Sequence, residues 1–491
     1  MSNGSAVTAS RELADFLADL SGGIDDRLTA LATDYLVDTL GCIVFGSQQP
    51  WSQAVIGHAL ATGADGPCTV IGTVTGIDAE SSTTPAMAAV PAERARSTTP
   101  SMAALANGAS AHAFELDDVH EEAISHPGAV VVPAALAIGQ SLDAAMTDVL
   151  EAIVVGYEAM GRAGIAVGPA AHMLGGFHPT SMSGVFGAAA AAGRLLGFDG
   201  ALLNHTFGIA TSFASGTMEF AASGGMAKRV HAGRAAEGGV TAALLVARGF
   251  EGADDGLAGR YGFCRVFTDA PRIELLTEDL GARWMIDEIT VKPYAACSDI
   301  HPMIQAAAEL RREAGPGGLT AEHIVRIEAE GPTKAAEQNS LDGTASVMAA
   351  QYSAQWNIAA ALVSDPGDPA IYAPDRITDP AVAALQSKVV SVTAHPDFDA
   401  TYAQKMGGRV RITLDDGSVL ERSVHGQIGS MHAPLTAAQI DAKFARVTGG
   451  LLPDPLAAAA AIRVTAAEPD VTTSDLISAL GFGRRHTRGT D

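Results

Sequence analysis

The sequence predicts a mainly α protein with a large all-helical domain and a smaller α+β domain. Apolar residues recur at helical spacing through the first half of the chain, whereas after about residue 270 they alternate as in strands. The chain has 491 residues, which is too long for one ordinary hydrophobic core. Its composition, 47% hydrophobic and 18% charged, is typical of a folded globular protein.

The helical pattern begins near the N-terminus, where Leu13, Phe16 and Leu17 lie on one helical face. Further stretches with the helical period cover residues 29–45, 147–167 and 184–196. The last stretch is dominated by alanine and glycine, whose small side chains allow helices to approach closely. We therefore expect residues 1–270 to form the helical domain.

Alternating apolar residues predict strands in the second half of the chain. The alternating sets are Val325, Ile327 and Ala329, then Val390, Val392 and Ala394, and finally Val410, Ile412 and Leu414. The last set runs into the turn-forming residues 415–418, which is the pattern of a β-hairpin.

Helical stretches at 302–312 and 349–363 lie between these strands, so we expect residues 271–430 to form the α+β domain. A helical pattern returns at 436–447 and 475–480. It indicates that residues 431–491 go back to the helical domain.

The net charge of −24, from 31 basic and 55 acidic residues, argues against nucleic acid or anionic membranes as partners. The four cysteines are scattered without a CxxC pair, which argues against a zinc or iron–sulfur site and against a disulfide framework. The sequence shows no long uncharged apolar stretch and no secretory signal pattern. We therefore expect a cytoplasmic protein without a membrane span.

Four of the fourteen histidines are followed by proline, namely His126, His178, His301 and His395. Proline is favoured in the first turn of a helix, so we expect the first three histidines just outside helix N-termini. There the helix dipole favours a bound anion and a neutral imidazole that can accept a proton. The alternative is that these histidines only cap helices, which is our interpretation of His395.

A second group of polar residues lies in the segment 107–120, where Glu115, Asp117 and Asp118 shortly precede His126. On a helix, Glu115 and Asp118 would share a face. Such acids can orient a catalytic histidine, or donate a proton when burial raises a carboxyl pKa. The alternative is a solvated acidic turn. No HExxH or similar ligand spacing occurs, so we expect no metal.

A third group is basic and comprises Lys228, Arg229, His231 and Arg234. Lys228 and His231 would share one helical face, and such a cluster can bind a carboxylate. The alternative is a surface patch that pairs with the protein's own acids. No glycine-rich nucleotide motif and no nucleophile motif occur, so we expect no organic cofactor.

A short internal repeat joins residues 82–89 to residues 97–104. Two copies at this spacing do not make a solenoid. We interpret the first copy and residues 90–96 as a surface insertion ahead of a helix.

In this order, the polar segments resemble the MmgE/PrpD family over nearly the whole chain. The resemblance rests on four blocks, which are Asn107-Gly108 with residues 111–118 and His126-Pro127, then 176–180, then 228–236, and finally 292–297 with His301-Pro302. Each block is weakly specific by itself, but together and in register they are strongly specific.

The resemblance implies a large helical domain, a smaller α+β lid domain and a homodimer. It implies an enzyme that acts on a small polycarboxylate without a metal or organic cofactor. By motif position, the family's active-site acid falls on Glu115, its two histidines on His126 and His178, and its substrate-binding lysine on Lys228. The family commonly has Asp at the first of these positions, and commonly Thr where this chain has Val119.

These observations predict a cofactor-independent lyase for a small di- or tricarboxylate. It would remove water, as 2-methylcitrate dehydratases do, or CO₂, as cis-aconitate decarboxylases do. The expected catalytic residues are Glu115, His126 and His178, and the expected substrate-binding residues are Lys228, Arg229, His231 and His301. The alternatives are an epimerase for an iminodisuccinate-like dicarboxylate and a non-catalytic polycarboxylate-binding protein.

Overall fold

The computed structural model describes residues 7–20, 23–72, 96–173, 175–220, 225–315, 317, 319–341 and 346–482. The chain forms two compact units. The larger unit comprises Met1–Ala113, Asp117–Ile289 and Ala437–Asp491, and the smaller unit comprises Phe114–Leu116 and Thr290–Thr436. Helices dominate the described residues, so the prediction of a mainly α protein is confirmed. That the smaller unit is a lid stays a prediction.

The larger unit is built mostly from helices. Its α-helices are α1 (Ala9–Ala18), α2 (Asp26–Gly46), α3 (Pro50–Thr62), α4 (Pro100–Ala111), α5 (Gly128–Leu142), α6 (Met146–Met173), α7 (Pro179–Leu195), α8 (Gly200–Ala210), α10 (Lys228–Val246), α11 (Phe263–Val266), α19 (Ala437–Thr448), α20 (Pro455–Ala467) and α21 (Thr473–Ala479). Its shorter elements are η2 (Thr211–Phe213), η3 (Ile273–Leu276), η4 (Met285–Glu288), β1 (Cys68–Thr69), β2 (Ser97–Thr98) and β3 (Val119–His120). These two-residue strands are a small departure from the all-helical domain that the sequence predicts.

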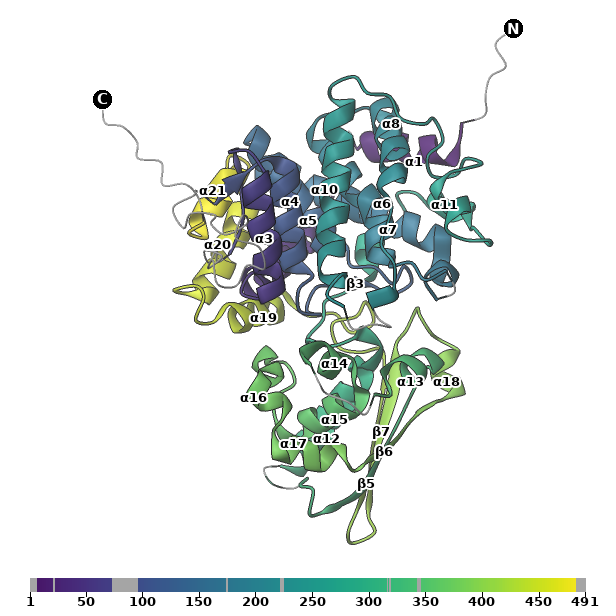
Figure 1. Cartoon of the computed structure of the whole chain (residues 1–491), viewed down its shortest axis with the longest axis vertical. Helices are drawn as coiled ribbons and strands as arrows, with labels where there is room; N and C mark the ends of the chain where they lie inside the picture. Colours follow the sequence, from purple (N-terminus) through teal and green to yellow (C-terminus); the bar gives the residue numbers. More distant parts are fainter. Residues whose placement is uncertain are drawn as a thin grey trace. The chain divides into compact units, whose positions relative to one another are not determined.

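Small residues let the helices of the larger unit approach closely. α10 packs against both α7 and α4, and α7 packs against α6 (Figure 1). A Cβ atom added to Gly239 of α10 would lie 2.6 Å from the Val185 carbonyl oxygen of α7. One added to Gly233 would lie 2.3 Å from the Leu105 carbonyl oxygen of α4. Close packing through alanine- and glycine-rich helices is therefore confirmed.

The helical stretches expected at 29–45, 147–167 and 184–196 are confirmed as α2, α6 and α7. Regular helical geometry in α6 is interrupted at Gly168, whose φ is 74°. Gly168 is one residue past the end of the helical stretch expected at 147–167. The second copy of the internal repeat forms β2 and the beginning of α4. The first copy and residues 90–95 of the proposed insertion lie outside the described residues.

α2 is long and apolar enough to cross a membrane, contrary to the impression from the sequence. However, 67% of its most apolar stretch is buried inside the protein. Burial of this kind is what a core helix shows, and α2 packs against α4, α6 and α19.

The C-terminal segment rejoins the larger unit through α19, α20 and α21, drawn in yellow (Figure 1). α19 packs along α2, where Lys443 Nζ lies 2.7 Å from Asp38 Oδ1. Both side chains of this ion pair are buried. The helices predicted at 436–447 and 475–480 are thus confirmed, whereas α20 was not predicted.

The smaller unit combines one sheet with short helices. Its helical elements are η5 (Ser298–Ile300), α12 (His301–Ala314), α13 (Thr333–Asn339), α14 (Val347–Tyr352), α15 (Ala354–Val363), η6 (Pro369–Tyr372), α16 (Pro374–Ile377), α17 (Pro380–Gln386) and α18 (Pro396–Asp399). Its strands are β5 (Ile324–Gly331), β6 (Val389–Ala394), β7 (Gly407–Leu414) and β8 (Val419–His425), and β4 (Ile289–Thr290) spans the boundary between the units in the sequence.

The four-stranded sheet has the order β6-β5-β7-β8, with β5 parallel to β6 and antiparallel to β7. α12 packs against β7 and β8 (Figure 1). The predicted hairpin is confirmed, because β7 and β8 pair antiparallel across residues 415–418. Gly417 has a φ of 84° there, a conformation that glycine adopts without strain.

Three details of this unit differ from the sequence prediction. Val390 is 61% exposed, although it alternates with the buried Val392. Val325 is 53% exposed, and Ile324 is buried in its place, because the register of β5 against β7 shifts between Ile324 and Arg326. The helix expected at 349–363 is broken into α14 and α15. Ser353 caps α15 there by accepting a hydrogen bond from the Trp356 amide, and its own backbone is extended.

Candidate functional site

A loop between α4 and α5 carries several of the polar residues that the sequence analysis selected. α4 ends at His112, which is its C-cap residue. The residues that follow are not helical, so the expectation that Glu115 and Asp118 share a helical face is wrong. Glu115 has a φ of 58°, which a helix cannot accommodate. Glu115, Asp117 and Asp118 are also almost fully buried, which contradicts the alternative of a solvated acidic turn.

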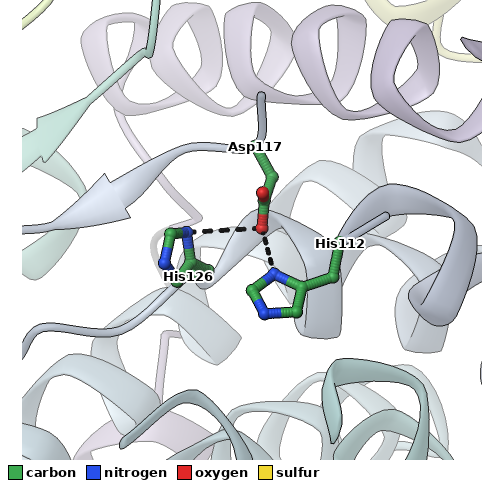
Figure 2. A group of neighbouring side chains, drawn as sticks. All are labelled: His112, Asp117 and His126. Carbon is green, nitrogen blue, oxygen red and sulfur yellow. Dashed lines mark hydrogen bonds and ion pairs between the residues drawn. The ribbon is translucent and has the colours of Figure 1, made fainter. Parts of the chain in front are cut away.

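Asp117 lies between two histidines. Its Oδ2 atom is 2.6 Å from His112 Nδ1 and 3.3 Å from His126 Nδ1. Figure 2 shows this carboxylate oxygen facing both imidazole rings. The ring centres of His112 and His126 are 4.9 Å apart. Asp117 therefore contacts the same nitrogen, Nδ1, on both rings.

His126 stands just before α5, as predicted, and its surroundings determine its tautomer. Its Nδ1 is 2.6 Å from the backbone carbonyl oxygen of Asp118. A carbonyl oxygen only accepts hydrogen bonds, so the proton must be on Nδ1. In the neutral ring, Nε2 then carries a lone pair that can accept a proton. The backbone amide of His126 donates to Thr180 Oγ1 at 3.2 Å, which joins this loop to α7.

Asp118 fixes the same loop to the beginning of α5. Its carboxylate accepts hydrogen bonds from the Gly128 amide at 2.8 Å and from the Tyr157 hydroxyl at 2.7 Å. Burial raises the pKa of Asp118 to about 7, although both hydrogen bonds oppose the shift. Both oxygens of this acid are thus used in holding the loop.

His178 is the N-cap residue of α7 and makes no side-chain capping hydrogen bond there. Its Nδ1 lies 3.1 Å from Nδ1 of His231 on α10, and its ring centre is 5.7 Å from that of His112. Burial, followed by the charges of His112 and Lys228, lowers the pKa of His178 well below its usual value. Burial likewise lowers the pKa of His231 to about 4. Both rings are therefore neutral near pH 7.

Lys228 begins α10 and is buried. Its charge contributes to the lowered pKa of both His178 and His231, and His231 lies one helical turn further along α10. A lysine at a helix N-terminus is unfavourable for the helix dipole, unless an anion is bound beside it. The structure therefore brings Lys228 together with His231 on α10 and with His178, which contacts His231.

The other two basic residues of this segment have different surroundings. The guanidinium of Arg229 lies over the Trp51 ring of α3, 5.2 Å from its centre. This contact supports packing of α3 against α10, and a substrate-binding role for Arg229 stays a prediction. Arg234 is exposed and forms an ion pair with Glu237. The interpretation as a surface patch therefore fits Arg234 and not the buried residues Lys228 and Arg229.

Glu115 and His301 both belong to the smaller unit. The Glu115 carboxylate lies 3.6 Å from Lys292 Nζ. His301 forms the first residue of α12 and does not lie outside it, and its Nε2 donates to the Ala296 carbonyl oxygen at 3.1 Å. His395, by contrast, caps α18 as expected by accepting from the Asp397 amide.

His112, Asp117 and His126 together offer the donor types of a metal site, with ligand atoms within 4.8 Å of one another. Two ligands of a tetrahedral zinc ion, each about 2.05 Å from the metal, are separated by about 3.3 Å. The 2.6 Å between His112 Nδ1 and Asp117 Oδ2 is shorter and is typical of a charge-assisted hydrogen bond. The three side chains thus fit a hydrogen-bonded array better than a tetrahedral metal site.

The arrangement can bind an anion and move protons. His126 and His178 precede α5 and α7, Lys228 begins α10, and these three helices pack against one another. Helix N-termini and a lysine attract carboxylates, and neutral imidazoles accept protons. The sequence analysis did not select His112. The sequence has no His-Pro pair at position 112. The hydrogen bond between His112 and Asp117 spans a non-helical loop, so no helical spacing indicates it.

Comparisons with known proteins identify the family of this chain. Residues 79–276 match the MmgE/PrpD N-terminal domain, and residues 294–468 match the MmgE/PrpD C-terminal domain. The cis-aconitate decarboxylase of Aspergillus terreus is 29% identical over 436 residues, which cover 85% of this chain and 84% of the relative.

Two further relatives have similar names. The cis-aconitate decarboxylase-like protein oryM of Aspergillus oryzae is 27% identical over 91% of both chains. The human cis-aconitate decarboxylase is 29% identical over 70% of this chain and 71% of the relative. These similarities support a lyase-type function. Because both family domains match and together cover most of its length, the chain belongs to the MmgE/PrpD family.

Proposed function

We propose that the protein is a cofactor-independent lyase that removes CO₂ from a small tricarboxylate of the cis-aconitate type. The observation that carries this proposal is the buried cluster of His112, His126, His178 and His231, in which Lys228 acts electrostatically on His178 and His231. The relatives named above, which carry the name cis-aconitate decarboxylase, favour CO₂ loss over the other reactions of the family.

Each part of the cluster has a task in this reaction. Lys228 and the N-terminus of α10 bind a carboxylate that stays on the substrate and stabilise the negative charge that develops when CO₂ leaves. A histidine then delivers a proton to carbon. The rings of His126 and His178 both lie beside that of His112, with ring centres 4.9 Å and 5.7 Å from it, and one of the two serves as acid or base.

Two other functions use the same groups. Loss of water from a 2-methylcitrate-like substrate needs a base for the carbon-bound proton and an acid for the leaving hydroxyl. Inversion of a stereocentre, as in an iminodisuccinate-like dicarboxylate, needs a base and an acid on opposite faces of one carbon. A polycarboxylate-binding protein would need the lysine but no proton transfer.

The test is a substrate panel followed by NMR in deuterated water. The full-length protein is incubated with cis-aconitate, 2-methylcitrate, citrate and iminodisuccinate, and released CO₂ is measured in parallel. We expect CO₂ and one solvent deuterium on a product carbon from the first compound. Loss of water from 2-methylcitrate, or inversion without CO₂, would replace the proposal by the corresponding alternative. Tight binding without any turnover would indicate a binding protein.

The variant His178→Ala tests the role of the cluster. We expect its rate to fall at least about 100-fold, the usual contribution of a general acid or base. The matched control is His205→Ala, because His205 lies on α8 and contacts the Gly252 carbonyl oxygen instead of the cluster. Equal rates for His178→Ala and wild type would contradict the assignment of His178.

A further inference from the structure

His112 occupies the middle of the histidine cluster. Its ring centre is 4.9 Å from that of His126 and 5.7 Å from that of His178. It is 1% exposed. Its Nδ1 contacts Asp117, whereas its Nε2 is buried and has no hydrogen-bond partner among the residues that the structure describes. A buried nitrogen of this kind is costly for the fold, unless a ligand pairs with it.

His112 differs from its neighbours in the electrostatic field that acts on it. His126 and His178 precede helices, where the positive end of the helix dipole disfavours an imidazolium ion. His112 instead ends α4, where the negative end of the dipole favours a cation. It is also 2.6 Å from a carboxylate oxygen of Asp117. Of these three histidines, it is the one that both ends a helix and lies within 2.6 Å of a carboxylate oxygen.

We infer that His112 is a further catalytic residue, which donates the proton from its Nε2 to the substrate carbon, and that Asp117 is its positioning residue. The inference rests on the proposed function, which leaves the proton donor open. Asp117 accepts a hydrogen bond from the Nδ1–H group of His112. This bond orients the ring so that Nε2 faces away from Asp117, as a carboxylate orients the imidazole in other acid–base sites.

The step is balanced without a co-reactant. The bond to the departing carboxylate breaks, CO₂ leaves, and the electron pair stays on the substrate, delocalised toward a remaining carboxylate. The carbon that gains hydrogen takes the proton from Nε2 of His112. The ring becomes neutral while Nδ1 keeps its hydrogen bond to Asp117, and a solvent proton then restores Nε2–H.

The test compares His112→Asn with wild type and with His120→Gln. Asparagine at position 112 can still donate to Asp117 from the place of Nδ1, but it lacks the reactive nitrogen. His120 is a buried histidine of the same loop. Its Nδ1 accepts from the Ala123 amide and its Nε2 lies 3.5 Å from Glu288, so His120→Gln leaves the Asp117 contacts in place.

We expect His112→Asn to lower kcat by about 100- to 10,000-fold, with a change in KM of less than about 3-fold. Deuterium transfer to the product carbon should fall by the same factor. The control His120→Gln should keep kcat within about 3-fold of wild type. A merely structural role for His112 would change KM and thermal stability along with kcat.

The variant Asp117→Asn tests the positioning role. The groups that face His112 are Asp117, His126 and His178, and His231 and Lys228 of α10 add their charges. Removing the one negative charge among them should lower kcat and leave KM nearly unchanged, because the His112 ring loses the carboxylate that orients it.

Each outcome decides the question. An active wild type with an equally active His112→Asn would overturn this inference and leave the proposed function intact. A wild type that turns over no compound of the panel would overturn the proposed function and this inference with it. If His112→Asn does not fold, His112→Gln with an unchanged circular dichroism spectrum serves the same comparison. An unchanged kcat in Asp117→Asn would overturn the role of Asp117.

Discussion

The buried ion pair between Lys443 and Asp38 allows a quantitative prediction about the attachment of the C-terminal segment. The two atoms are 2.7 Å apart, and the side chains are 7% and 1% exposed. Burial raises the pKa of Asp38, and the charge of Lys443 opposes this shift. Replacing Lys443 by methionine keeps most of the volume of the side chain but leaves Asp38 without its partner.

The expected cost follows from the burial of both groups. Removing one partner of a fully buried ion pair destabilises a protein by roughly 3–5 kcal/mol. The entropy of unfolding is about 2.1 cal/mol/K per residue, which gives about 1 kcal/mol/K for the 491 residues. The Lys443→Met variant should therefore unfold at a temperature about 3–5 °C lower than wild type, provided that the chain unfolds cooperatively.

The assay is calorimetry together with urea unfolding of four proteins. The double variant Asp38→Leu/Lys443→Met should regain most of the lost stability, because neither charge is then left unpaired in the interior. The control is Arg11→Gln, which breaks the Arg11–Asp15 pair on α1. Those side chains are 43% and 48% exposed, so this change should cost less than about 1 kcal/mol.

Two results would refute this reasoning. If Lys443→Met costs no more than Arg11→Gln, the pair is solvated and the burial argument fails. If the double variant is as unstable as Lys443→Met, the loss comes from packing between α19 and α2 and not from an unpaired charge.

Three further predictions concern the site. Lys228→Met should weaken binding of a tricarboxylate by about 10- to 150-fold in isothermal titration, the loss of one charged hydrogen bond, and should weaken a monocarboxylate less. Arg234→Gln, the exposed control, should leave affinity unchanged, and equal effects of the two variants would contradict the lysine's role. Gly128→Ala should lower the free energy of unfolding by about 1–3 kcal/mol in urea, because the added Cβ would lie 2.5 Å from Thr39 Oγ1 and 2.9 Å from Asp118 Oδ1. A variant as stable as wild type would show that the loop moves to accommodate the Cβ at no cost. Because the pKa of Asp118 is raised to about 7 in the folded protein, wild type should lose stability relative to Asp118→Asn as the pH rises from about 4 through 7. A constant difference between their unfolding midpoints over this range would show that Asp118 does not titrate as described.

Local sequence patterns were sufficient to predict many individual elements of the fold. α2, α6 and α7 follow from the helical spacing of apolar residues, and the β7–β8 hairpin follows from alternation and a turn containing Gly417. The pattern failed where long-range contacts intervene. Val325 is exposed because a register shift against β7 turns it outward, and no sequence period encodes such a shift.

For the site, the sequence by itself determined that His126 and His178 precede helices, because proline in the first turn is a local signal, although His301 begins its helix instead of preceding it. It also identified the lysine that begins α10. Only the tertiary structure decided which of these groups meet. His112 was not selected from its neighbours in the sequence, and it becomes important because Asp117, His126 and His178 surround it. Glu115 was selected, yet its contacts place it with Lys292 in the smaller unit. The physical reason is that a helix start depends on a few adjacent residues, whereas a hydrogen-bond partner, its tautomer and its burial depend on which distant segments fold against it.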